Sequence, residues 1–185
     1  MVKVTGDSVL VLIDVQAAWN DPVWGKRNNP EAEEKMSIVL RKFREHNLRV
    51  IHVRHDSRNP KSLLREGKPG FEFKKEVAPL KGETIITKHV NSALIGTDLD
   101  KLLREMGNPS VYFAGLTTDH CVSTSARMAG NLGYRTFVIG DACATFERRG
   151  KIGGMIPADM VHQVNLASID GEFAEVVNSG ELEFQ

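Results

Sequence analysis

The chain has 185 residues, with 24 Lys and Arg balanced by 24 Asp and Glu, so its formal net charge is zero. Without a basic surplus, the composition excludes a charge-driven nucleic-acid binder and gives no reason to expect a membrane partner. Two cysteines are too few for a disulfide framework, and the apolar run near the start is too short to span a membrane and lacks a signal-peptide cleavage site. We therefore expect a cytoplasmic protein with one domain over residues 1–185.

Along the chain, segments typical of strands alternate with segments typical of helices. The predicted strands are 8–15, 48–55, 84–88, 111–114, one ending near Gly140, and a short one near 165–169. The predicted helices are 31–46, one capped at Thr97 or Asp98 that runs to about 106, one from 122 to about 132, a short one begun at Pro157 or Ala158, and a terminal one. This alternation predicts a doubly wound α/β fold, with a mostly parallel sheet between helices.

The polar segment 56–83 is long for a connection inside a compact domain. Such segments are usually functional. Together with the Pro- and Asn-rich loop 20–30, we expect it to border a substrate site.

Residues 111–133 predict a buried strand, a turn and a helix, with Cys121 near the start of the helix and Gly133 as its C-terminal cap. Thr117, Thr118 and Asp119 are all plausible N-caps. A thiolate at this position would be stabilised by the helix dipole, so we expect a lowered thiol pKa. The alternative is that Cys121 is simply a small buried side chain, as we interpret Cys143, which has no helix start around it.

Three predicted strand ends carry chemically useful residues: Asp14 follows the first strand, Lys88 ends the third, and Cys121 lies one turn beyond the fourth. In a parallel sheet these ends share one edge, so the three side chains can converge. An acid beside a thiol can take its proton and return it to a leaving group, and a lysine can stabilise the thiolate and orient the acid. Taken singly, the aspartate could be a turn former and the lysine a solvated side chain.

The same residues carry a family resemblance. Asp14 in VLIDVQ, Lys88 in ITKHVNSALIGTDL and Cys121 in GLTTDHCVSTSARMAGNLGY resemble the isochorismatase-like cysteine hydrolases, which include nicotinamidases and N-carbamoylsarcosine amidase. The resemblance implies a three-layer, Rossmann-like α/β/α fold with a six-stranded sheet, a homo-oligomer, and an Asp14, Lys88 and Cys121 triad that cleaves a small amide through a thioester. It also implies a cis peptide between Leu116 and Thr117, with the backbone N–H groups of Thr117 and Cys121 forming an oxyanion hole.

The sequence departs from parts of that family. Nicotinamidases carry an Asp-x-His metal motif after the second strand, whereas this chain has His52, His55 and Asp56 in a different order, so we expect no metal and no cofactor. Members that cleave isochorismate generally lack the cysteine, so Cys121 disfavours that activity.

The substrate is predicted to be a small molecule, and its identity stays open. Candidates to line its pocket are Trp19, Asn91, Leu116, His120 and the pair Phe71 and Phe73. For Trp19, Asn91 and the phenylalanine pair, ordinary packing is an equal alternative, and for His120 a structural role or a place in the pocket wall is favoured over that of a base. Two other functions stay open as well: a thiol redox sensor or binding protein that uses the same pocket, and an oligomer component with a vestigial site.

Overall fold

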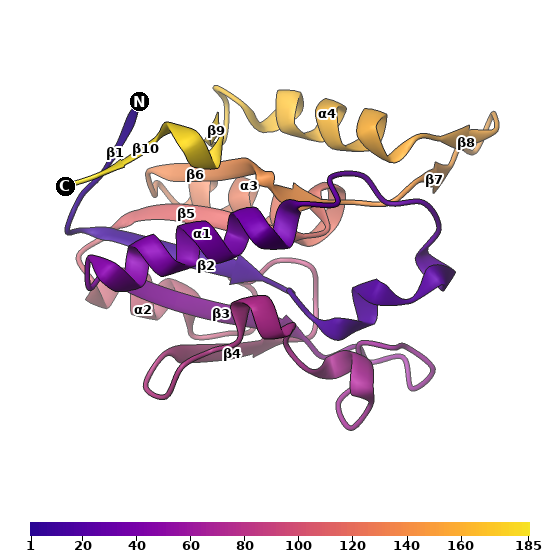
Figure 1. The fold of residues 1–185 in the computed structure, drawn as a ribbon, viewed down its shortest axis with the longest axis horizontal. Coiled ribbons are helices and arrows are strands. Elements are labelled where there is room, and N and C mark those ends of the chain that lie inside the picture. Colours follow the sequence, from indigo (N-terminus) through magenta and orange to yellow (C-terminus); the bar gives the residue numbers. More distant parts are fainter.

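The computed structural model describes residues 1–185 and places a six-stranded, entirely parallel sheet at the centre of the molecule (Figure 1). Its strands, in sheet order, are β4 (Thr84–Lys88), β3 (Arg49–His55), β2 (Ser8–Ile13), β5 (Ser110–Leu116), β6 (Thr136–Ala144) and β9 (Glu175–Val177). The chain runs outward from β2 to β4, then returns to place β5 on the other side of β2. This reversal creates a topological switch point between β2 and β5, where ligands of such sheets bind.

Helices cover both faces of the sheet, as the alternating sequence pattern predicts. Helix α1 (Ala32–Glu45) lies on the face toward the viewer in Figure 1, and α2 (Leu99–Glu105) and α3 (Ser123–Asn131) lie behind the sheet. Each layer has its own buried apolar cluster, because alternate residues of β2 point to opposite faces: Leu10 and Leu12 face α1, and Val9, Val11 and Ile13 face α2 and α3. The three-layer α/β/α prediction is confirmed.

Several short elements complete the fold. They are the parallel pair β1 (Val2–Val4) and β10 (Leu182–Phe184), the antiparallel pair β7 (Arg148–Arg149) and β8 (Met155–Ile156), and α4 (Ala158–Ile169). Single helical turns follow β2 at η1 (Ala17–Asn20) and η2 (Pro22–Trp24), and others lie within 56–83 at η3 (Pro69–Phe71) and η4 (Lys75–Val77). The last turn is η6 (Ser179–Glu181).

Two predictions near the C-terminus are wrong. Residues 165–169 form the end of α4 instead of a strand, and the expected terminal helix is replaced by β9, η6 and β10. The physical reason lies in the exposure of α4, which buries only three side chains and leaves Met160 and Val164 more than half exposed. Its apolar residues therefore do not follow the clean stripe that identifies an amphipathic helix from sequence.

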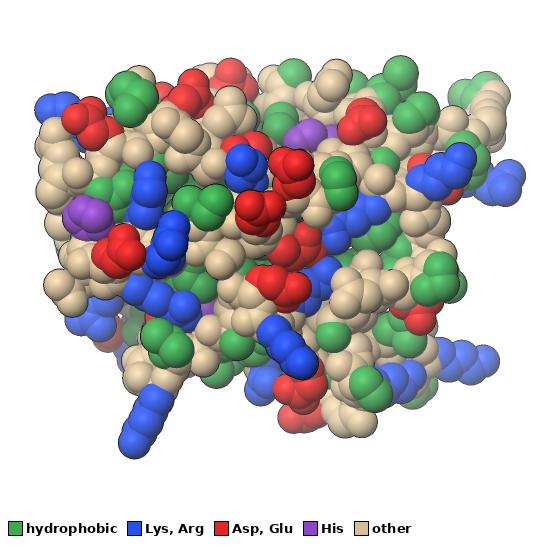
Figure 2. Space-filling view, viewed as in Figure 1, with side chains coloured by type: hydrophobic (Ala, Val, Ile, Leu, Met, Phe, Trp, Pro, Cys, Tyr) green, Lys and Arg blue, Asp and Glu red, His purple; other side chains and the backbone are tan.

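Charged side chains of both signs are interspersed on the face that α1 covers (Figure 2), in keeping with the equal numbers of acidic and basic residues. None of the helices combines the length and the apolar character needed to cross a lipid bilayer.

Candidate active site

Asp14 lies immediately beyond β2, at the switch point of the sheet. Its backbone has a φ of 51°, in the left-handed region that aspartate tolerates better than most residues. Its N–H donates to Val53 O at 2.8 Å, and its carbonyl accepts from Gln16 N–H at 2.8 Å and from Trp19 Nε1 at 2.6 Å. These bonds hold the turn, and the Asp14 side chain is fully buried.

Lys88, the last residue of β4, forms a buried ion pair with Asp14. Lys88 Nζ lies 2.7 Å from Asp14 Oδ2, and both side chains are 0% exposed. Alternation along β4 places Lys88 on the same face as Ile86, which packs in the cluster under α2 and α3. Despite this short distance, Lys88 Nζ makes no hydrogen bond of regular geometry to either carboxylate oxygen of Asp14, and the carboxylate acts on the Cys121 thiol, whose pKa it raises.

Cys121 lies in η5, a turn of π-helix over Thr118–Val122 that joins β5 to α3. Its Sγ accepts a hydrogen bond from Lys88 Nζ at 3.3 Å, and the residue is only 8% exposed. The structure thus brings together the aspartate, lysine and cysteine that follow three different strands. Their catalytic roles stay a prediction.

The expected low pKa of Cys121 is wrong. Burial of the thiol raises its pKa, and the neighbouring Asp14 carboxylate raises it further; Lys88 lowers it but does not compensate. The sequence argument counted the positive end of the following helix and the nearby lysine but not the burial of the thiol, and the helix α3 begins only two residues later, at Ser123. The resting thiol therefore keeps its proton at neutral pH.

Of the three predicted N-caps, Thr117 occupies the N-cap position of η5, but its side chain makes no capping hydrogen bond, and neither Thr118 nor Asp119 is an N-cap of η5 or α3. Thr118 is paired with His162 of α4, through Oγ1 and Nδ1 at 2.8 Å. Asp119 accepts from Arg148 at 2.8 Å and from the hydroxyl of Thr145. These side chains instead fasten the cysteine turn to the neighbouring elements.

The peptide bond between Leu116 and Thr117 is cis, as the family resemblance implies. Just before it, Gly115 has a φ of 136°, and a Cβ at that position would lie 2.0 Å from the carbonyl oxygen of Ile13. Only glycine allows β5 to approach the end of β2 this closely. The close approach brings the segment that carries Cys121 next to Asp14.

His55 is a site residue that the sequence reasoning considered only as a metal ligand. It ends β3, and its Nδ1 lies 3.1 Å from Lys88 Nζ. Gln16 holds its backbone from both sides: Gln16 Oε1 accepts from His55 N–H at 2.8 Å and Gln16 Nε2 donates to His55 O at 3.1 Å. The signal was present in the sequence, since His55 is a polar residue at a strand end, like Asp14 and Lys88.

Asp14, His55 and Cys121 each offer one atom that could bind a metal, and the three atoms lie within 4.8 Å of one another. Lys88 Nζ lies 2.7 Å from Asp14 Oδ2, 3.1 Å from His55 Nδ1 and 3.3 Å from Cys121 Sγ. The cation that this cluster surrounds is therefore the lysine ammonium, and a metal ion would have to displace it.

Comparison with known proteins identifies the family. The isochorismatase domain model matches residues 8–181, nearly the whole chain. The chain belongs to the isochorismatase family. Isochorismatase family protein YrdC of Bacillus subtilis is 43% identical over 173 residues, which cover 94% of this chain and 92% of that protein. A crystal structure of an isochorismatase-family protein from Chromobacterium violaceum superposes with a TM-score of 0.91 at 45% identity, covering 94% of this chain and 91% of that one.

A further relative is named for its reaction. Maleamate amidohydrolase of Pseudomonas putida is 33% identical over 112 residues, which cover 60% of this chain and 47% of that enzyme. Amide hydrolysis is thus among the activities named within the isochorismatase family.

Four of the predicted pocket residues lie in different surroundings in this isochorismatase-family chain. Trp19 packs against Trp24 and Phe146, and Leu116 is fully buried in the core beneath α1. Asn91 and His120 are exposed. Their roles toward a substrate stay predictions.

Of the two loops expected to border a substrate site, segment 56–83 contacts the turn that follows Asp14, and the role of both loops toward a substrate stays a prediction. Gln16 Nε2 donates to Phe71 O at 2.9 Å, and Ala17 N–H donates to Glu72 O at 2.8 Å, so segment 56–83 is bound directly to the turn after Asp14. A cavity of about 490 Å³ lies between residues 21–24 and 57–63. Both of its walls follow the carboxyl ends of strands, β2 and β3.

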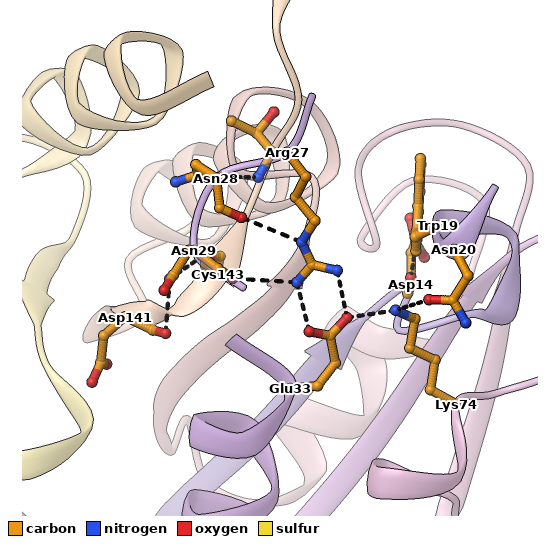
Figure 3. A network of polar contacts seen from close by, with 11 residues as sticks. Asp14, Trp19, Asn20, Arg27, Asn28, Asn29, Glu33, Lys74, Asp141 and Cys143 are labelled. Atoms are coloured by element: carbon orange, nitrogen blue, oxygen red, sulfur yellow. Dashed lines mark hydrogen bonds and ion pairs between the residues drawn. The ribbon is translucent and has the colours of Figure 1, made fainter. Parts of the chain in front are cut away.

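A buried polar network holds the loop after β2 in place (Figure 3). Glu33 at the start of α1 accepts from Arg27 at 2.6 Å and from Lys74 at 2.6 Å. Burial alone would raise the pKa of Glu33, but the hydrogen bonds from Arg27 and Lys74 lower it to about 2. Asn29 donates to the carbonyls of Asp141 and Cys143, which ties the same loop to β6. The loop is thereby fixed between the carboxyl-terminal part of β6 and the start of α1.

Proposed function

We propose that this isochorismatase-family chain is a cysteine-dependent amidohydrolase that cleaves a C–N bond of a small, non-peptide molecule through a thioester. The observation that carries the proposal is the buried contact set at the switch point: Lys88 Nζ lies 2.7 Å from Asp14 and 3.3 Å from the sulfur of Cys121. A nucleophile, a base and a fixed positive charge are the groups that acyl transfer needs. The activity of the relative named maleamate amidohydrolase supports the same reaction class.

In the first half of the reaction, the thiol proton of Cys121 passes to Asp14 as the sulfur attacks the amide carbonyl carbon. The raised thiol pKa makes this transfer part of the attack, because no thiolate is formed in advance. Asp14 then gives the proton to the departing nitrogen, the C–N bond breaks, and an acyl thioester remains on the sulfur.

In the second half, Asp14 takes a proton from water, and the resulting hydroxide attacks the thioester carbonyl. The C–S bond breaks, the sulfur regains a proton from Asp14, and a carboxylic acid leaves. Lys88 stays an ammonium throughout and stabilises the negative charge on Asp14 and on the sulfur. The backbone N–H groups of Thr117 and Cys121 are the proposed donors to the oxyanion.

The burial of Cys121 bears on the redox alternative. Thiols that sense oxidants are accessible and have a lowered pKa. Cys121 is 8% exposed and its pKa is raised, so the site favours hydrolysis over redox sensing.

The test measures ammonia release from a panel that contains maleamate, nicotinamide, pyrazinamide, carbamoylated amines, ureido acids and lactams. The wild type is compared with Cys121→Ala and with Cys143→Ala, which removes a fully buried cysteine that is not a member of the triad. We expect at least one amide to be hydrolysed by the wild type and by Cys143→Ala, but not by Cys121→Ala. Hydrolysis by all three proteins would disprove the proposed nucleophile.

A further inference from the structure

The ammonium of Lys88 has more acceptors around it than it has hydrogens. Hydrogen bonds of regular geometry run to His55 Nδ1 at 3.1 Å, Val90 O at 3.2 Å and Cys121 Sγ at 3.3 Å. Asp14 Oδ2 is the nearest acceptor, at 2.7 Å, yet it receives no such bond. Since an ammonium group has three hydrogens, the bond to His55 uses one that could otherwise turn to Asp14.

The direction of the His55 contact follows from the donor. An ammonium group only donates, so Nδ1 of His55 must be the acceptor, and the imidazole is neutral with its proton on Nε2. The ring cannot easily leave, because the fully buried Gln16 bonds the backbone of His55 on both sides. His55 is therefore built into the site as an acceptor for Lys88.

We propose that His55 is a positioning residue that keeps a hydrogen of Lys88 away from Asp14, so that the Asp14 carboxylate stays free to take the thiol proton of Cys121. This inference rests on the proposed hydrolysis. A carboxylate that accepts a hydrogen bond from an ammonium is a weaker base than one that does not. Without the acceptor at position 55, the free hydrogen turns to the nearest oxygen, 2.7 Å away, and proton transfer from the thiol slows.

Protonation of His55 has the same consequence as its removal, because an imidazolium cannot accept from Lys88. The charged or titratable groups that face the ring are Lys88 of β4, Asp14 beyond β2, Cys121 of η5, and the neighbouring Asp56 and His89. Burial lowers the pKa of His55 and Lys88 lowers it further, against smaller opposing effects of the two carboxylates. The neutral, accepting ring therefore prevails at physiological pH, and the accepting state is lost as the pH falls through the lowered pKa.

Two substitutions of His55 test the inference. His55→Leu removes the acceptor, and His55→Asn retains one, since the asparagine Oδ1 can occupy the position of Nδ1 but cannot be protonated. We expect kcat to fall about ten-fold or more in the leucine variant, the cost of a lost hydrogen bond to a charged group, and to return close to the wild-type value in the asparagine variant. KM should change little, because His55 acts on the triad.

The pH profile separates positioning from a structural role. The wild type should lose activity toward acid pH as His55 is protonated, and the asparagine variant should keep its activity to lower pH. His46→Leu, at an exposed histidine beyond the end of α1, is the control and should leave both kcat and the profile unchanged.

Alkylation of Cys121 by iodoacetamide provides a second measurement that needs no substrate. The rate should fall about ten-fold in His55→Leu and recover in His55→Asn, for the same reason. If no amide on the panel is hydrolysed, the hydrolase proposal fails, but the alkylation rates of Cys121 still test the positioning role of His55. Wild-type alkylation rates in the leucine variant, or equal losses in both folded variants, would refute the positioning role.

Discussion

The buried pair of Asp14 and Lys88 should contribute unequally to stability when its two members are removed. In Lys88→Met, the Asp14 carboxylate loses its only cation and has no regular hydrogen bond in its place. Breaking a buried ion pair in this way costs about 3–5 kcal/mol. In Asp14→Asn, the ammonium still has three acceptors, in His55, Val90 and Cys121, so the cost should be smaller, about 1–3 kcal/mol.

Urea unfolding, followed by circular dichroism, measures both variants and the double variant, which should be more stable than Lys88→Met because no charge is left unpaired. Lys101→Met is the matched control, since Lys101 pairs with Glu105 at 3.9 Å with both side chains more than half exposed. Its stability should stay within about 0.5 kcal/mol of the wild type. Equal losses in the two single variants, or a double variant whose loss is their sum, would show that the pair does not act as one unit.

Three further predictions follow from single residues. Gly115→Ala should destabilise the protein by about 3 kcal/mol or more in urea unfolding, because its Cβ would meet a β2 carbonyl at 2.0 Å, whereas Gly180→Ala, in open space, should change little. The pKa of Glu33 is lowered from 4.5 to about 2, so the ionised carboxylate stabilises the folded protein fully above pH 4.5, and this stabilisation is lost as the pH falls toward 2. Thermal unfolding at several pH values should show a decrease in melting temperature over this range that is absent in Glu33→Gln. Iodoacetamide should label Cys121, which is 8% exposed and has the Asp14 carboxylate beside it to take the thiol proton, and it should spare Cys143, which is 0% exposed. Peptide mass spectrometry showing Cys143 modified in the folded protein would contradict this.

The parts of the site that the sequence predicted depend on local patterns. Asp14 and Lys88 follow short runs of β-branched residues, and the edge that they share is a property of every parallel sheet. Their convergence with Cys121 therefore required only correct strand ends. Where apolar residues did not follow a clean period, as in 165–169 at the end of α4, the element type was predicted wrongly, although the start of that helix at Ala158 was predicted correctly.

The properties that the sequence could not predict depend on residues that are far apart in the sequence and come together only in the folded protein. The accepting nitrogen of His55 is set by Lys88, 33 positions later, and the backbone of His55 is held by Gln16, 39 positions earlier. The pKa of Cys121 likewise depends on how deeply the thiol is buried and on the Asp14 carboxylate. A motif gives the residue types of a site, whereas protonation states come from packing.

A thiol that keeps its proton at rest has a consequence for selectivity. A preformed thiolate would react with any electrophile that reached it, whereas in the proposed mechanism Cys121 becomes nucleophilic only when Asp14 takes its proton. That transfer needs an unbonded carboxylate oxygen, which the structure provides because Lys88 directs its hydrogens to His55, Val90 and the sulfur. If the proposal holds, the reactivity of the cysteine is set by the hydrogen-bond direction of the Lys88 ammonium, and a substrate whose carbonyl lies against the sulfur supplies the remaining driving force for the proton transfer.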